Sequence, residues 1–147
     1  MITLTEEQLK EIADLLVSGM IAYYNIKTNE IESVIDFDSW ESIDDEPWQD
    51  VLDKIEENSE DYISFEKMSS NQSFSMMERF AESVDNTKLQ NRLLSALEKA
   101  HPFRNFKWEI DNAGDYRKDW FTFRDQSYVE WVKEQLESYN GFPDDDE

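Results

Sequence analysis

The chain has no cysteine, a single histidine, and only three glycines and three prolines among its 147 residues. The absence of cysteine excludes a disulfide framework, a thiolate nucleophile and thiolate metal ligands. With His101 as the sole histidine, a cluster of histidine metal ligands is excluded as well. Gly19, Gly114 and Gly141 lie far apart in the sequence, which excludes a glycine-rich phosphate-binding loop. We therefore expect no metal site and no cofactor.

Long apolar runs are also missing. A membrane-spanning helix needs about 18 to 20 consecutive apolar residues, and the sequence contains no such run. The first seven residues include two glutamates and lack the basic and apolar segments of a signal peptide. The sequence therefore predicts a soluble, cytoplasmic protein with no attachment to a membrane.

Basic residues are scarce and unevenly placed. The chain holds 14 Lys and Arg against 35 Asp and Glu, which gives a net charge of -21. Residues 1–68 contain 19 acidic and only 4 basic residues, whereas most of the basic residues follow this segment. Aromatic residues make up 14% of the chain, which opposes disorder despite the charge because disordered acidic chains contain few aromatics. The pattern indicates a folded protein with an acidic N-terminal half.

The periodicity of apolar residues predicts an α+β fold. Thr5 and Gln8 form a capping-box pattern ahead of a helical stripe that ends at Gly19. A β-hairpin is predicted over residues 20–37, and a short third strand near 61–66. Apolar residues at helical spacing predict further helices. These begin after Pro47, after Ser69 or Ser70, after the break at 85–87 and after Pro102, and a last one runs from Tyr116 to about Tyr139. We therefore predict one domain over residues 1–143, with a small antiparallel sheet packed on a mostly helical C-terminal half, and a disordered acidic tail at 144–147.

Several motifs in the second half occur in the order typical of a known family. They are Asp61-Tyr62-Ile63, Ser70, Phe74, Met77-Glu78-Arg79-Phe80, Leu93, Ala96-Leu97, Pro102-Phe103-Arg104-Asn105-Phe106-Lys107, Trp120-Phe121-Thr122-Phe123-Arg124 and Trp131. In these residues the chain resembles the bacterial Uncharacterised Protein Family 158, over roughly residues 61–137. The family is of unknown function, so the resemblance implies a compact bacterial α+β domain and no catalytic residue.

The acidic half suggests a function in protein binding. Closely spaced carboxylates accelerate association with a cationic partner. We expect a non-enzymatic interaction module whose acidic surface binds a basic protein. The residues expected to bind the partner are Asp36, Asp38, Asp44, Asp45 and Glu46. The alternative interpretation of these carboxylates is a solvated face without a partner.

The segment 99–124 suggests two further alternatives. Basic residues alternate there with aromatics, a composition that can bind single-stranded nucleic acid. Asp111, Asp115 and Asp119 cancel much of the positive charge, so binding to nucleic acid is disfavoured. The cations Arg104, Lys107 and Arg124 could instead form an anion-binding cluster, as part of a hydrolase or transferase site that includes a carboxylate. Ion pairing of these cations with surplus carboxylates is the structural alternative. The sequence decides neither the enzyme question nor the oligomeric state.

Overall fold

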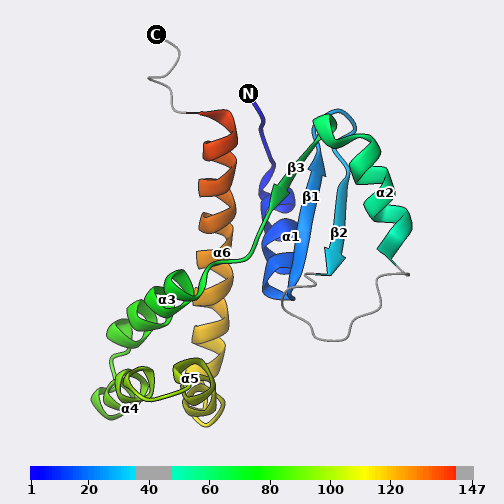
Figure 1. Ribbon diagram of the computed structural model, residues 1–147. Helices are drawn as coiled ribbons and strands as arrows, with labels where there is room; N and C mark the ends of the chain where they lie inside the picture. The colour runs from blue at the N-terminus through cyan, green and yellow to red at the C-terminus, as the bar shows by residue number, and fades with distance from the viewer. Residues whose placement is uncertain (36–47, 142–147) are drawn as a thin grey trace. The chain divides into compact units, whose positions relative to one another are not determined.

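The computed structural model describes residues 1–35 and 48–141, and it combines helices with a small antiparallel sheet (Figure 1). In chain order the elements are α1 (Glu6–Val17), β1 (Met20–Asn25), β2 (Ile31–Ile35), α2 (Gln49–Glu57), the short 3-10 helix η2 (Ser59–Asp61), β3 (Tyr62–Phe65), α3 (Ser70–Ser83), α4 (Thr87–Glu98), α5 (Pro102–Asp111) and α6 (Tyr116–Asn140). The predicted α+β class, with a helical C-terminal half, is confirmed.

The chain divides into two compact units. Unit 1 comprises residues 1–67 and 128–147, and unit 2 comprises residues 68–127. Helix α6 therefore supplies its first part to unit 2 and the rest to unit 1. The expectation of one domain over residues 1–143 stays a prediction. The tail 144–147, expected to be disordered, lies outside the described residues.

In unit 1, α1 begins at the capping box that the sequence predicts. The Thr5 hydroxyl accepts a hydrogen bond from the backbone N–H of Gln8 at 3.1 Å, and the Gln8 side chain accepts one from the N–H of Thr5 at 2.9 Å. The helix packs against β1 and buries four apolar side chains: Leu9, Ile12, Ala13 and Leu16. Gly19 has a φ of 90°, a conformation that glycine adopts at little cost, and the chain turns there from helix into strand.

The sheet has the strand order β2-β1-β3, with both pairs antiparallel. Tyr24 of β1 lies opposite Ile31 of β2 and Ile63 of β3. The buried Asn25 side chain shapes the hairpin turn, because its oxygen accepts hydrogen bonds from the N–H groups two and three residues later, at 2.8 and 3.0 Å. The predicted hairpin and third strand are confirmed. The expected extension of the second strand to residue 37 lies outside the described residues.

Side chains of α6 form hydrogen bonds with backbone groups at the edge of β3 that faces away from β1. The Tyr139 hydroxyl donates to the carbonyl of Ser64 at 2.7 Å, and the N–H of Ser64 donates to it at 3.2 Å. Gln135 accepts from the N–H of Glu66 at 3.0 Å and donates to its carbonyl at 3.1 Å, and the Trp131 indole donates to the same carbonyl at 2.7 Å. The three α6 residues are spaced four apart, which places them on one face of the helix. An open edge strand invites pairing with other chains, and here this edge is closed.

In unit 2, the helices begin at the predicted signals. A capping box between Ser69 and Gln72 opens α3, with hydrogen bonds of 3.2 and 2.8 Å. The Asn86 side chain accepts from the N–H of Leu89 at 3.0 Å and caps α4. Pro102 is the first residue of α5, where its missing N–H costs nothing. Its neighbour His101 precedes the helix with a φ of 57° and is exposed.

The core of unit 2 is aromatic. Phe106 lies edge-on to Trp120 with ring centroids 5.0 Å apart, and Phe80 lies edge-on to Trp120 at 5.3 Å. The apolar spacing along these helices predicts one core of nine residues: Phe74, Met77, Phe80, Leu93, Leu97, Phe103, Phe106, Trp120 and Phe123. Leu93 and Leu97 of α4 are buried, as this prediction requires. Other members of the predicted core, Phe74, Met77 and Phe123, are half-buried.

The prediction was wrong for Phe103, which is 36% exposed. Its ring lies at the rim of a pocket, so that one part contacts the pocket lining while the rest meets solvent. Trp108, later on the same helix, is 63% exposed.

Candidate functional site

The five residues expected to bind a partner, Asp36, Asp38, Asp44, Asp45 and Glu46, lie outside the described residues. Their role stays a prediction. The acidic character of unit 1 nevertheless continues into elements that the structure describes.

Helix α2 and η2 carry a row of exposed carboxylates, here called the acidic face of α2: Asp50, Asp53, Glu56, Glu57 and Glu60. None of these five forms an ion pair with another described residue, and the Asp53 carboxylate accepts only a hydrogen bond from the Gln49 amide, at 2.8 Å. The one cation on α2 is directed elsewhere, because the Lys54 ammonium lies 2.6 Å from Glu32 and 3.9 Å from Glu30. Its hydrogen bond to Glu32 raises the pKa of Lys54 above 10.5. Lys27 lines one pocket with Glu57 and Glu60 but pairs with Asp61 at 3.1 Å, so the five carboxylates are left without an ion pair in the described part of the chain.

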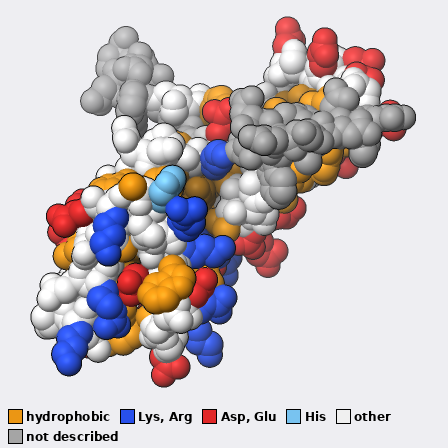
Figure 2. Space-filling view, turned by 60° about the horizontal axis from the view of Figure 1, so that its bottom comes forward, with side chains coloured by type: hydrophobic (Ala, Val, Ile, Leu, Met, Phe, Trp, Pro, Cys, Tyr) orange, Lys and Arg blue, Asp and Glu red, His pale blue; other side chains and the backbone are white. Residues whose placement is uncertain are grey.

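The three cations expected to form an anion-binding cluster are only partly brought together. Lys107 of α5 and Arg124 of α6 line the same pocket, while Arg104 is exposed and does not line it. Figure 2, in which the α4–α5 end of unit 2 comes forward, shows Lys and Arg side chains gathered around an exposed hydrophobic side chain. Of the three cations expected to cluster, two therefore line one pocket and the third does not.

The α5–α6 pocket, as we call this cavity, has a volume of about 550 Å³. Its apolar wall consists of Met77, Phe103, Phe106, Ile110, Trp120 and Phe121, and its charged groups are Lys107, Asp111, Arg117 and Arg124. All ten residues belong to unit 2. The pocket therefore joins an aromatic wall to three cations and one carboxylate.

Phe121 lies between two guanidinium groups in this pocket. The Cζ atoms of Arg117 and Arg124 are 4.7 and 4.9 Å from the centroid of its ring, within the range of a cation–π interaction. Arg117 also donates from Nε to Asp111 at 3.2 Å, and Arg124 donates from Nε and Nη2 to Asp125 at 3.1 and 3.0 Å. These contacts hold both guanidinium planes in place.

Sequence reasoning missed Arg117 and Phe121. Together with Arg124 they are spaced four and three residues apart, which places them on one face of a helix. This spacing was readable in the sequence.

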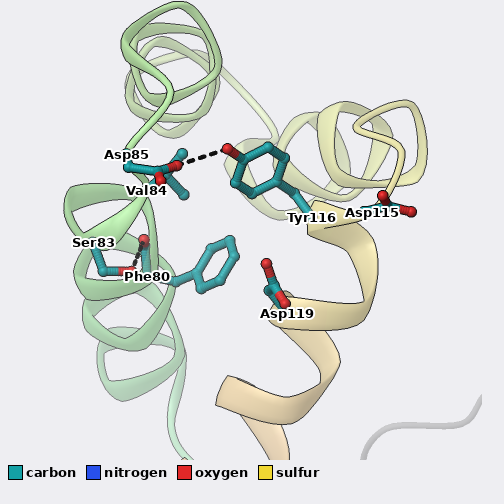
Figure 3. Close-up of a pocket in the computed structure, with 7 residues that line it drawn as sticks. All are labelled: Phe80, Ser83, Val84, Asp85, Asp115, Tyr116 and Asp119. Carbon is teal, nitrogen blue, oxygen red and sulfur yellow. Dashed lines mark hydrogen bonds between the residues drawn. The ribbon is translucent and has the colours of Figure 1, made fainter.

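A second cavity of unit 2, the Asp85–Tyr116 recess, has a volume of about 480 Å³ and is lined by Phe80, Ser83, Val84, Asp85, Asp115, Tyr116 and Asp119. Figure 3 shows Phe80 and Asp85 on one side of it, and Tyr116 and Asp119 on the side of α6. The Tyr116 hydroxyl donates to Asp85 at 2.7 Å, and this hydrogen bond raises the pKa of Tyr116 above 10.0. The recess ties the end of α3 to the start of α6, and its charged groups are all carboxylates.

The described residues contain neither a cluster of metal ligands nor a helix that could span a membrane. No group of three or more His, Asp or Glu side chains is arranged there to hold a metal ion. None of the helices that the structure describes is both long and apolar enough to cross a membrane.

Comparison with known proteins identifies the family. The model of the Uncharacterised protein family UPF0158 matches residues 18–143. The chain belongs to this family. The match begins well before the segment 61–137 on which the resemblance was first based.

The chain is similar to a curated UPF0158 protein from Pseudomonas aeruginosa, with 28% identity over 87 residues. The aligned part covers 58% of this chain and 57% of the relative, so the chain spans little more than half of that protein's length. No solved structure matches the chain. The family has no established function to transfer to the sites described above.

Proposed function

We propose that the protein is a non-enzymatic interaction module that binds a basic protein partner through the acidic face of α2. The observation behind the proposal is the row of exposed, unpaired carboxylates on α2 and η2. The residues expected from the sequence to bind the partner, Asp36, Asp38, Asp44, Asp45 and Glu46, precede α2 in the chain, and we propose that they contribute to the same binding.

The charge pattern of α2 supports this proposal because it is unfavourable for the isolated helix. Asp53 stands three residues after Asp50 and four before Glu57, so like charges face each other along one side of the helix. Such pairs destabilise a helix by a few tenths of a kcal/mol each. The helix has no fully buried residue with which to offset this repulsion. A cationic partner would relieve this repulsion, and the relief would add to the free energy of binding.

The chemistry of this face predicts the kinetics of binding. Exposed charges at the rim of an interface act mainly on the association rate, and salt screens them. Binding should therefore be fast at low salt and slower at physiological salt, while the dissociation rate changes little. These signatures distinguish recognition by charge from recognition through an apolar surface.

The test uses the full chain as bait in an extract of the native host, at low and then moderate salt. The variant carries Asp53→Lys and Glu57→Lys, and the matched control carries Glu7→Lys and Glu11→Lys on α1. Both pairs are exposed, lie four residues apart and change the net charge equally. The wild type and the control should retain the same basic proteins, and the α2 variant should lose them.

Kinetic measurement on one purified partner completes the test. The α2 variant should slow association by at least about tenfold with dissociation nearly unchanged. Equal losses in the variant and the control would show that net charge alone causes retention. Full retention by the α2 variant would show that the partner binds elsewhere.

A further inference from the structure

We infer that the α5–α6 pocket binds a small ligand that combines a flat apolar body with one anionic group, a carboxylate or a phosphate. This inference concerns unit 2 and residues that the proposed function does not use. The experiment on this pocket and the experiment on the acidic face of α2 therefore test the two proposals independently.

The apolar wall accounts for the flat body of the ligand. Ligand pockets typically have volumes of about 300–1,000 Å³ and are lined mainly by apolar and aromatic side chains with a few polar groups. The α5–α6 pocket, at about 550 Å³, fits this description. Phe106 and Trp120 are almost fully buried and fixed edge-on to each other, so this part of the wall is rigid. Phe103 is partly exposed, so its ring can pack against a ring of the bound ligand.

The charges around the pocket account for the anionic group. Three cations and one carboxylate line it, so the lining carries a net positive charge. Arg117 engages its carboxylate through Nε, which leaves both of its terminal nitrogens without a hydrogen-bond partner among the described residues. Lys107 forms no ion pair with any residue that the structure describes. The terminal nitrogens of Arg117, whose guanidinium is held by Asp111, and the ammonium of Lys107 are donors suited to an incoming carboxylate or phosphate.

The same geometry favours a small ligand over single-stranded nucleic acid. Binding of a strand requires successive exposed aromatic rings on which bases stack. The most exposed aromatic of α5, Trp108, does not line the pocket, and the rings that do line it include two that are almost fully buried. The pocket therefore offers one recessed site rather than a row of exposed rings along a surface.

The experiment measures binding of four probes to the full chain by NMR titration. The probes are naphthoate, naphthyl phosphate, the uncharged naphthamide and a short single-stranded oligonucleotide. At least one of the two aromatic anions should bind at least about tenfold more tightly than the amide, because charge-assisted hydrogen bonds strengthen binding by about that much or more. The tighter of the two anions indicates whether the natural ligand carries a carboxylate or a phosphate.

Three variants locate the site. Lys107→Gln and Arg117→Gln should each weaken binding of the preferred anion by about tenfold, and both residues are exposed, so the fold should tolerate the changes. Arg104→Gln is the matched control, since this cation lies on the same helix outside the pocket. It should bind like the wild type.

Several results would overturn the inference. They are equal binding of the amide and both anions, equal weakening by Arg104→Gln and Lys107→Gln, the absence of binding by any aromatic probe, and binding of the oligonucleotide with higher affinity than either aromatic anion. Unchanged binding in both pocket variants, with their amide spectra otherwise native, would also overturn it.

Discussion

Phe106→Ala tests the aromatic core of unit 2 most directly. The ring is 1% exposed and lies edge-on to Trp120 at 5.0 Å. Its removal forfeits the transfer free energy of a fully buried aromatic side chain and leaves a cavity, and Phe→Ala changes in cores typically cost about 3–5 kcal/mol. The lost edge-to-face pair accounts for about 0.5–1.5 kcal/mol beyond burial. We expect a loss in the upper part of the range for Phe→Ala, because Phe106 packs against Trp120, which is itself buried and cannot easily move to fill the cavity.

The assay is urea denaturation followed by far-ultraviolet circular dichroism and by the fluorescence of the five tryptophans, which include Trp120. The matched control is Phe103→Ala, on the same helix and three residues away. Because Phe103 is 36% exposed, its truncation removes less buried apolar surface and should cost clearly less than Phe106→Ala. A loss below about 1 kcal/mol for Phe106→Ala, or equal losses for the two variants, would refute this description of the core.

Three further predictions concern charge, titration and capping. Raising the salt concentration from low to physiological should raise the melting temperature, because screening weakens the self-repulsion of a net charge of -21, and a steady fall would contradict this. The hydrogen bond to Asp85 raises the pKa of Tyr116, so it should stabilise the fold below about pH 10 and be lost as the pH rises through the raised value. Asp85→Asn should lower the Tyr116 midpoint, measured by ultraviolet absorbance against Tyr116→Phe, and an unchanged midpoint would disprove the pairing. Ser69→Ala should cost about 1 kcal/mol of unfolding free energy through loss of the α3 cap, whereas Ser70→Ala should cost much less.

Local signals in the sequence predicted most of the elements. Thr5 with Gln8, Pro102 and Gly19 act through their own backbone and near neighbours, so their effect can be read without knowledge of the rest of the fold. Runs of β-branched and aromatic residues on either side of a polar turn likewise predicted the hairpin, and a short β-prone run predicted the third strand.

Features that depend on contacts between distant residues could not be predicted in the same way. Phe103 and Phe106 belong to one apolar stripe, yet only the packing of neighbouring helices decides that one ring is buried and the other lies at a pocket rim. The same holds for the candidate site. Lys107 and Arg124 were predicted to cluster and do line one pocket, whereas Arg104, three residues before Lys107 on α5, does not line it.

The closure of the β3 edge by α6 has a consequence for synthesis of the chain. Ser64 and Glu66 are made well before their partners Trp131, Gln135 and Tyr139, and all 60 residues of unit 2 emerge between them. Unit 2 is continuous in sequence, so it can fold while unit 1 is still incomplete. Until the second part of α6 leaves the ribosome, the nascent chain presents an unsealed strand edge, and such edges are sites of misassembly. The interval between these two stretches is therefore when a nascent chain of this fold most needs a chaperone.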